Sequence, residues 1–163
     1  MKKVLTYISL VLLVILTTSA GRYIEIMGVS PNPALCFVII YSLTNGSVKS
    51  AALGFVCGLM FDSVSDVAFG FNSLILMYMC ILSSYFSKRF YYYNKIALVF
   101  GVFMYSLFYE TISLLFTAVI FSDAPFFYTF VRFALVEAIL NSIIAIPLLW
   151  WVKWLNNEYI RGI

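Results

Sequence analysis

The side chains of this chain that could do chemistry are a few charged and amide groups inside long apolar segments. Glu110 lies in one such segment, and Glu137 and Asn141 lie one helical turn apart in the next. At about 1.5 Å of helix per residue, Glu110 and Glu137 fall at nearly the same depth, with Arg132 above them. Carboxylates in apolar surroundings are costly and usually partnered. We therefore predict a polar cluster of Glu110, Arg132, Glu137 and Asn141 that bridges the two segments.

Two roles are open for this cluster. It could hold helices together by hydrogen bonds, or it could form a path for protons or solutes. A path is disfavoured because the chain contains no histidine, the side chain that most often switches its charge near neutral pH. No series of carboxylates continues from the cluster toward the opposite side of the membrane either. The structural role is the favoured interpretation.

A second pattern is a stripe of small residues that ends in a carboxylate. Gly54, Gly58 and Asp62 follow one another at intervals of four residues, and Gly70 and Asn72 open the next apolar segment. Glycines at this spacing let two helix backbones approach closely. The stripe could pack against another helix of the same chain, or it could be a docking groove for the transmembrane helix of a partner.

No pattern in the sequence predicts catalysis, and we expect no enzyme activity, no cofactor and no metal site. The sequence shows no nucleophile–base pair, phosphate-binding loop or metal-ligand spacing. The three cysteines, Cys36, Cys57 and Cys80, lie inside apolar runs and are predicted to be small packing residues. Asp62 and Asp66 could form a cation site, but an ordinary loop at the end of a helix is the favoured interpretation.

The elements that must position these residues are membrane helices. Of 163 residues, 64% are hydrophobic and only 10% are charged, whereas soluble domains carry about 25% charged residues. This composition excludes a soluble enzyme, a nucleic-acid-binding protein and a disordered linker. We predict an all-α membrane protein whose six transmembrane helices form one compact bundle. The chain is then a single integral membrane domain, residues 1–163, with approximate spans 4–21, 33–45, 48–62, 71–87, 96–121 and 129–152.

Two parts of this assignment leave alternatives. The first segment resembles a secretory signal peptide that could be cleaved after Ala20, although its length favours an uncleaved helix. The second and third segments are short, so residues 33–62 either cross the membrane twice or form a re-entrant hairpin.

The basic residues predict the orientation. Six crossings place most of them on one side, namely Lys2, Lys3, Lys49, Lys88, Arg89, Lys95, Lys153 and Arg161, and leave only Arg22 and Arg132 on the other. Short loops rich in lysine and arginine stay in the cytoplasm. Both termini of this multi-pass protein are therefore predicted to be cytoplasmic.

The middle of the chain resembles the MreD family of bacterial rod shape-determining proteins. The resemblance covers about residues 31–90 and rests on Pro33, Gly46, the stripe of small residues, and Gly70 with Asn72. In that family the two glycines, the aspartate and the following glycine recur, which implies a shared role for Gly54, Gly58, Asp62 and Gly70. The family is also similar in fold to the six-helix substrate-binding subunits of energy-coupling-factor vitamin transporters.

The resemblance implies a non-enzymatic membrane scaffold of the cell-wall elongation (Rod) complex. Such a scaffold would bind MreC directly and assemble with MreB, RodA and a class B penicillin-binding protein, coupling peptidoglycan synthesis to the cytoskeleton. Membrane lipid would surround it, and no nucleic acid is expected. The alternative is a vitamin-binding transporter subunit. Many members of that family carry an Ala-x-x-x-Ala stripe on the first helix, where the energising subunit docks. This alternative is disfavoured because the first segment here has no alanine before Ala20. An orphan proton-coupled carrier is a third, weaker possibility.

Overall fold

The architecture is known from a computed structural model, which describes residues 2–20, 25–26, 28–45, 47–65, 68–90, 95–121 and 126–155. Within these ranges the chain is helical and contains no strand, apart from one isolated bridge between Ile26 and Val29. The helices are α1 (Lys2–Ala20), α2 (Pro33–Thr44), α3 (Ser47–Asp62), α4 (Phe71–Phe90), α5 (Lys95–Phe121), α6 (Phe126–Thr129), the π-helical turn η2 (Phe130–Ala134) and α7 (Leu135–Leu155). The all-α prediction is confirmed.

The centre of the molecule is α2, a helix that other helices surround. Every residue from Pro33 to Ile40 is buried, and α2 packs against α1, α3, α4, α5 and α7. A helix that is apolar all round belongs in the interior, which explains why the α2 sequence shows no polar face. Asn32 caps its first turn by accepting a hydrogen bond from the Leu35 amide at 3.0 Å.

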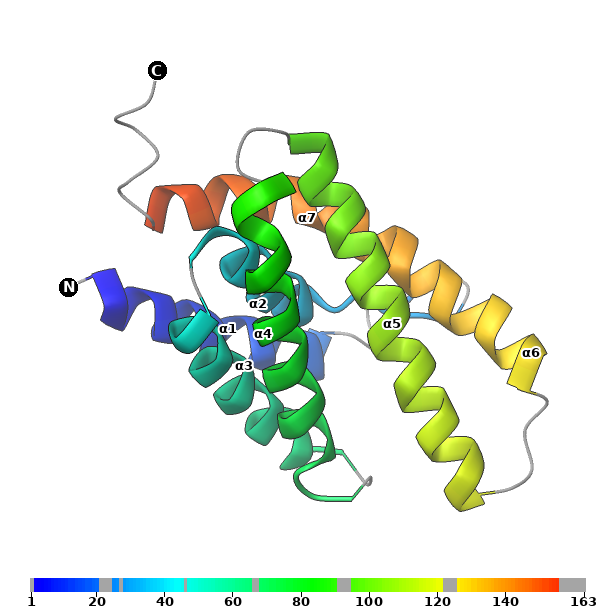
Figure 1. Ribbon diagram of the computed structural model, residues 1–163. Coiled ribbons are helices and arrows are strands. Elements are labelled where there is room, and N and C mark those ends of the chain that lie inside the picture. Colours follow the sequence, from blue (N-terminus) through cyan, green and yellow to red (C-terminus); the bar gives the residue numbers. More distant parts are fainter. Residues whose placement is uncertain are drawn as a thin grey trace.

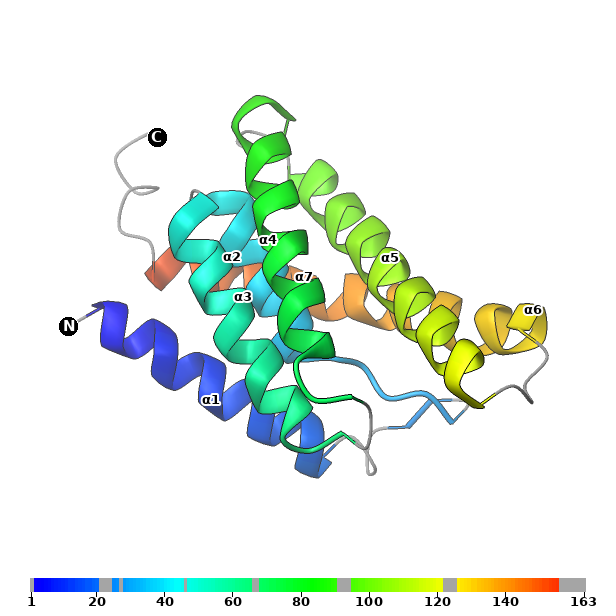
Figure 2. The ribbon, with the colours of Figure 1, turned by 60° about the horizontal axis from the view of Figure 1, so that its bottom comes forward.

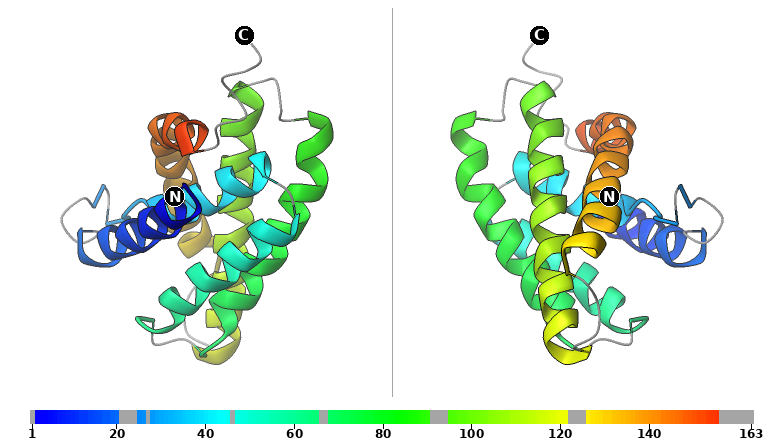
Figure 3. Two further views of the ribbon diagram at one scale, coloured as in Figure 1. Left: turned by 90° about the vertical axis from the view of Figure 1, so that its left-hand side faces the viewer. Right: turned by 90° about the vertical axis from the view of Figure 1, so that its right-hand side faces the viewer.

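The remaining helices surround α2. Figure 1 shows α4 in front of α2, with α1 and α3 on the left, α5 on the right, and α7 crossing behind from right to left. In Figure 2, α3 and α4 run side by side as a hairpin. The first turns of α1 and the last turns of α7 lie close together at one end of the molecule (Figure 3), where the indole of Trp151 donates a hydrogen bond to Ser9 Oγ at 3.3 Å.

Two of the described helices are long and apolar enough to cross a membrane, at Lys95–Ala118 and Phe130–Leu155. The other apolar stretches are shorter: Val4–Ser19, Pro33–Thr44 and Phe71–Tyr85. The 12 residues of α2 extend about 18 Å, against a hydrocarbon core of about 30 Å. By length and composition two described helices could therefore cross a membrane, while six complete crossings stay a prediction.

Several predicted features fall outside the described residues. These are Arg22, Gly46, Asp66 and Arg161, together with the side chains of Lys2, Lys3, Lys88 and Arg89. The three cysteines are described, and each is free and buried, as predicted for packing residues.

Candidate functional site

Asp62, the last residue of α3, caps the neighbouring helix α4. It is only 4% exposed. Its Oδ1 accepts a hydrogen bond from the Asn72 amide at 3.0 Å, and its Oδ2 accepts from the Ser73 amide at 3.1 Å and from Ser73 Oγ at 2.5 Å. The first amides of a helix lack partners within that helix and favour a negative charge. The carboxylate therefore stabilises the start of α4 while tying it to the end of α3.

The two glycines of the stripe lie where α3 and α4 cross. A Cβ atom at Gly58 would lie 2.3 Å from Ser73 Cα, and one at Gly54 would lie 2.8 Å from the Leu76 carbonyl oxygen. Both distances are too short for any side chain. The stripe is thus filled by α4 of the same chain, which corresponds to the internal-packing alternative that the sequence left open.

The other two residues of the pattern complete this hairpin. Gly70 has φ +97°, a left-handed conformation that residues with a side chain rarely adopt, and its carbonyl accepts the Leu74 amide at 3.0 Å. The side chain of Asn72 donates to Ser65 Oγ at 3.4 Å, and its Oδ1 accepts from the Tyr109 hydroxyl at 2.8 Å. Asn72 therefore links the α3–α4 hairpin to α5.

Asn141, on α7, joins two further segments of the chain. It is fully buried. Its Oδ1 accepts the Asn32 amide at 2.7 Å, and its Nδ2 donates to Ser106 Oγ at 3.3 Å. Its backbone carbonyl also accepts the Cys36 thiol at 3.4 Å. One amide side chain thereby holds the start of α2 and the middle of α5 against α7.

Glu110 and Glu137 meet between α5 and α7. Their side chains interact with one another, and the side chain of Glu137 also interacts with that of Asn141. The structure thus brings together Glu110, Glu137 and Asn141 of the predicted cluster.

Arg132 lies apart from these three residues. It is exposed, and its guanidinium donates a hydrogen bond to the Tyr128 hydroxyl at 2.6 Å and lies over the rings of Tyr128 and Phe133. Five residues of regular helix rotate a side chain by about 500°, which leaves Arg132 and Glu137 on different faces. Arg132 lies within the π-helical turn Phe130–Ala134, which changes this rotation further.

Sequence reasoning missed two parts of this polar interior. One is Tyr109, whose buried hydroxyl bonds to Asn72. The other is a serine cluster in which Ser42 Oγ bonds to the Cys80 carbonyl oxygen at 2.7 Å, to Ser84 Oγ at 3.1 Å and to Ser83 Oγ. Hydroxyl groups in apolar runs often bond between membrane helices, so Ser42, Ser83 and Ser84 could have been singled out.

The arrangement as a whole is a network of buried hydrogen bonds that joins α2, α3, α4, α5 and α7. Within the described ranges, every buried polar side-chain atom has a hydrogen-bond partner. In the same residues, no three histidine, cysteine, aspartate or glutamate side chains gather closely enough to hold a metal ion. Such a network fixes the relative positions of helices, which is the chemistry expected of a structural membrane core.

Comparison with known proteins gives one finding. The family model described as rod shape-determining protein MreD matches residues 1–158. No curated protein and no solved structure shows significant similarity to the chain. The expected likeness in fold to vitamin transporter subunits therefore stays a prediction.

Proposed function

The chain belongs to the family of the rod shape-determining protein MreD, and from this membership we propose that it is a non-enzymatic scaffold of the cell-wall elongation complex. In this proposal it resides in the bacterial inner membrane as one domain that crosses six times. It binds MreC directly, and through MreC it acts with MreB, RodA and a class B penicillin-binding protein to couple peptidoglycan synthesis to the cytoskeleton.

The observation that carries the proposal is the extent of the family match. It covers residues 1–158 of 163, so it includes every described helix. The buried polar network supports a scaffold because its groups bond to one another within the protein, and because Glu110, Glu137 and Asn141 hold α7 to α5 and α2.

We further propose that the α3–α4 hairpin presents the surface for the MreC transmembrane helix. The residues that the family resemblance singles out, from Gly54 to Asn72, all build this hairpin. Its outer face carries exposed apolar side chains, among them Phe55 and Val56 on α3 and Tyr78 on α4. Because α4 covers the glycine stripe, the stripe contributes to MreC binding only by setting the shape of the hairpin.

The test is co-purification of MreC with this chain from membranes, combined with crosslinking. Single cysteines at Phe55 and Tyr78 should crosslink to a cysteine series along the MreC transmembrane helix, in a background where Cys36, Cys57 and Cys80 are alanine. A cysteine at Ile139, an exposed position of α7, a helix that does not pack against α3 or α4, is the control for another face and should give little product.

Two outcomes would contradict the proposal. Failure of MreC to co-purify with the folded wild-type chain would reject MreC as a direct partner. Crosslinks at Ile139 with none at Phe55 or Tyr78 would keep the partner and reject the hairpin as its surface.

A further inference from the structure

A groove between α5 and α7 lies apart from the polar network. Its cavity has a volume of about 640 Å³ and is lined by the first turns of α5, from Lys95 to Phe103, and by α7 from Ser142 to Lys153. Most of the lining residues are apolar, and four of these are exposed, namely Ile96, Phe100, Ile146 and Trp150. The groove therefore offers an apolar surface that opens to the outside of the protein.

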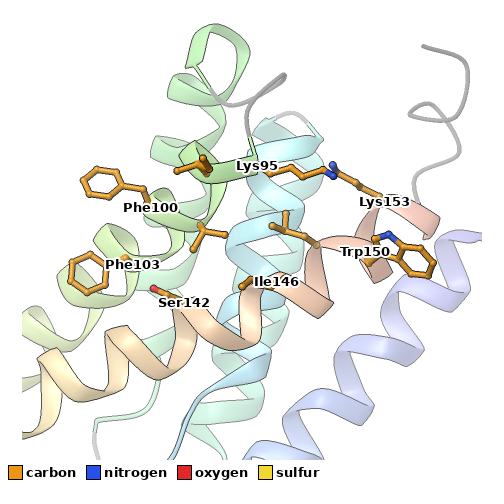
Figure 4. Close-up of a pocket in the computed structure, with 10 residues that line it drawn as sticks. Lys95, Phe100, Phe103, Ser142, Ile146, Trp150 and Lys153 are labelled. Carbon is orange, nitrogen blue, oxygen red and sulfur yellow. The ribbon is translucent and has the colours of Figure 1, made fainter. Parts of the chain in front are cut away.

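Two lysines stand at one end of this groove. Figure 4 shows the side chains of Lys95 and Lys153, from α5 and α7, pointing toward one another across the groove. The two ammonium groups repel each other, and an anion that lies between them is attracted to both. The end of the groove is thus complementary to a negatively charged group.

The length of the groove matches one leaflet of a bilayer. From Lys95 to Phe103 α5 rises about 12 Å, and from Ser142 to Lys153 α7 rises about 16 Å. Half of a hydrocarbon core is about 15 Å. The lysines lie on the predicted cytoplasmic side, and the 84% exposed Trp150 lies beside Lys153, as tryptophan does at the level of lipid headgroups.

We propose that this groove binds an anionic phospholipid of the cytoplasmic leaflet. An acyl chain lies along the apolar walls, and the phosphate lies between Lys95 and Lys153. A transmembrane helix of a partner fits less well, because it would continue through both leaflets while the groove spans about one. A zwitterionic lipid fits less well because its cationic headgroup would meet two ammonium groups. The proposal goes beyond the scaffold role and does not depend on MreC.

The test is native mass spectrometry of the full chain extracted from vesicles of phosphatidylglycerol and phosphatidylcholine in equal amounts. The wild-type chain should retain phosphatidylglycerol in preference to phosphatidylcholine. Lys95→Gln and Lys153→Gln should each lower this retention about fivefold. Lys49→Gln, which removes the same charge from an exposed residue of α3 outside the groove, is the matched control and should change nothing.

Further variants separate lipid binding from effects on folding. Lys153→Arg keeps the charge and should keep the lipid. Ile146→Trp should fill the groove and displace the lipid, whereas Ile139→Trp, an exposed position two turns away on α7 and outside the groove, should not. The thermal stability of each variant is measured on the same purified sample, and a loss of lipid counts only where this stability equals that of the wild-type chain.

Three results would overturn the proposal. The first is equal retention of the two lipids by the wild-type chain. The second is an equal loss on Lys49→Gln, which would indicate general attraction to the protein surface. The third is displacement of the lipid by dissolved inorganic phosphate at low concentration, which would indicate a site for the phosphate alone.

Discussion

At the scale of single residues, Asp62 shows how one carboxylate can serve two helices. It ends α3 and accepts three hydrogen bonds from the start of α4. A buried carboxylate is costly unless such bonds compensate for the lost water. Here the compensation comes from amides that would otherwise lack partners, so the carboxylate and the helix start stabilise each other.

Replacing Asp62 should destabilise the protein. Asp62→Ala leaves the Asn72 and Ser73 amides without their partner, and we expect a loss of about 1–3 kcal/mol in the free energy of unfolding. Asp62→Asn keeps one acceptor oxygen and should lose less. Unfolding of the detergent-purified variants measures both. Glu25→Ala removes an exposed carboxylate and should have no effect; equal stability of Asp62→Ala and wild type would contradict the capping role.

The contrast between Glu137 and Arg132 also belongs to this scale. Depth along the two helices predicted that Glu110 and Glu137 lie at one level, and the structure places their carboxyl groups in contact. The same reasoning joined Arg132 to them, and the structure places it with Tyr128. Depth is a one-dimensional quantity, whereas contact also depends on the face of the helix.

At the scale of elements, the α3–α4 hairpin is the most closely packed pair of helices. Its backbones approach at Gly54 and Gly58 so closely that no Cβ atom fits. Close approach gives van der Waals contact along the whole crossing, which is the main force that associates helices in lipid. The hairpin is therefore a rigid unit on which α2 and α5 pack.

Enlarging Gly58 should separate the two helices. We expect Gly58→Leu to lower the unfolding free energy by more than the 1–3 kcal/mol or so of ordinary overpacking, because the clash is with the backbone of Ser73. Gly54→Leu should lower the unfolding free energy in the same way, through a clash with the Leu76 carbonyl oxygen. Ala52→Leu adds the same side chain to an exposed position of α3 and is the control. Thermal unfolding measures the stability of all three variants. A Gly58→Leu variant as stable as the wild-type chain would contradict the close approach of α3 and α4 at this position.

At the scale of the whole molecule, the positions of the helix ends bear on the predicted orientation. The start of α1 and the end of α7 lie at one end of the molecule, and the α3–α4 connection lies at the other (Figures 1 and 2). This arrangement supports the proposal of an even number of crossings with both termini on one side.

Labelling of single cysteines in intact cells tests this orientation. A membrane-impermeant maleimide should label cysteines placed at Glu25 and Phe69 and should leave cysteines at Lys49 and Lys95 unlabelled, because only the first pair is predicted to face outward. All four positions are exposed in the protein, and the native cysteines are replaced by alanine. Detergent permeabilisation should allow all four to react. Labelling of Lys49 or Lys95 in intact cells would contradict the orientation.

The sequence by itself determined that the chain is helical, that it is apolar enough for a membrane, and that Gly54, Gly58 and Asp62 share one helix face. These properties depend on composition and on spacing within one segment, and the physics of a helix fixes them locally. Only the tertiary structure decided that α4 fills the glycine stripe, that α2 lies in the centre, and that Tyr109 bonds to Asn72. The spacing of residues shows which of them share a helix face, but it does not show which helix packs against that face. Contacts between distant segments depend on how all the helices pack at once.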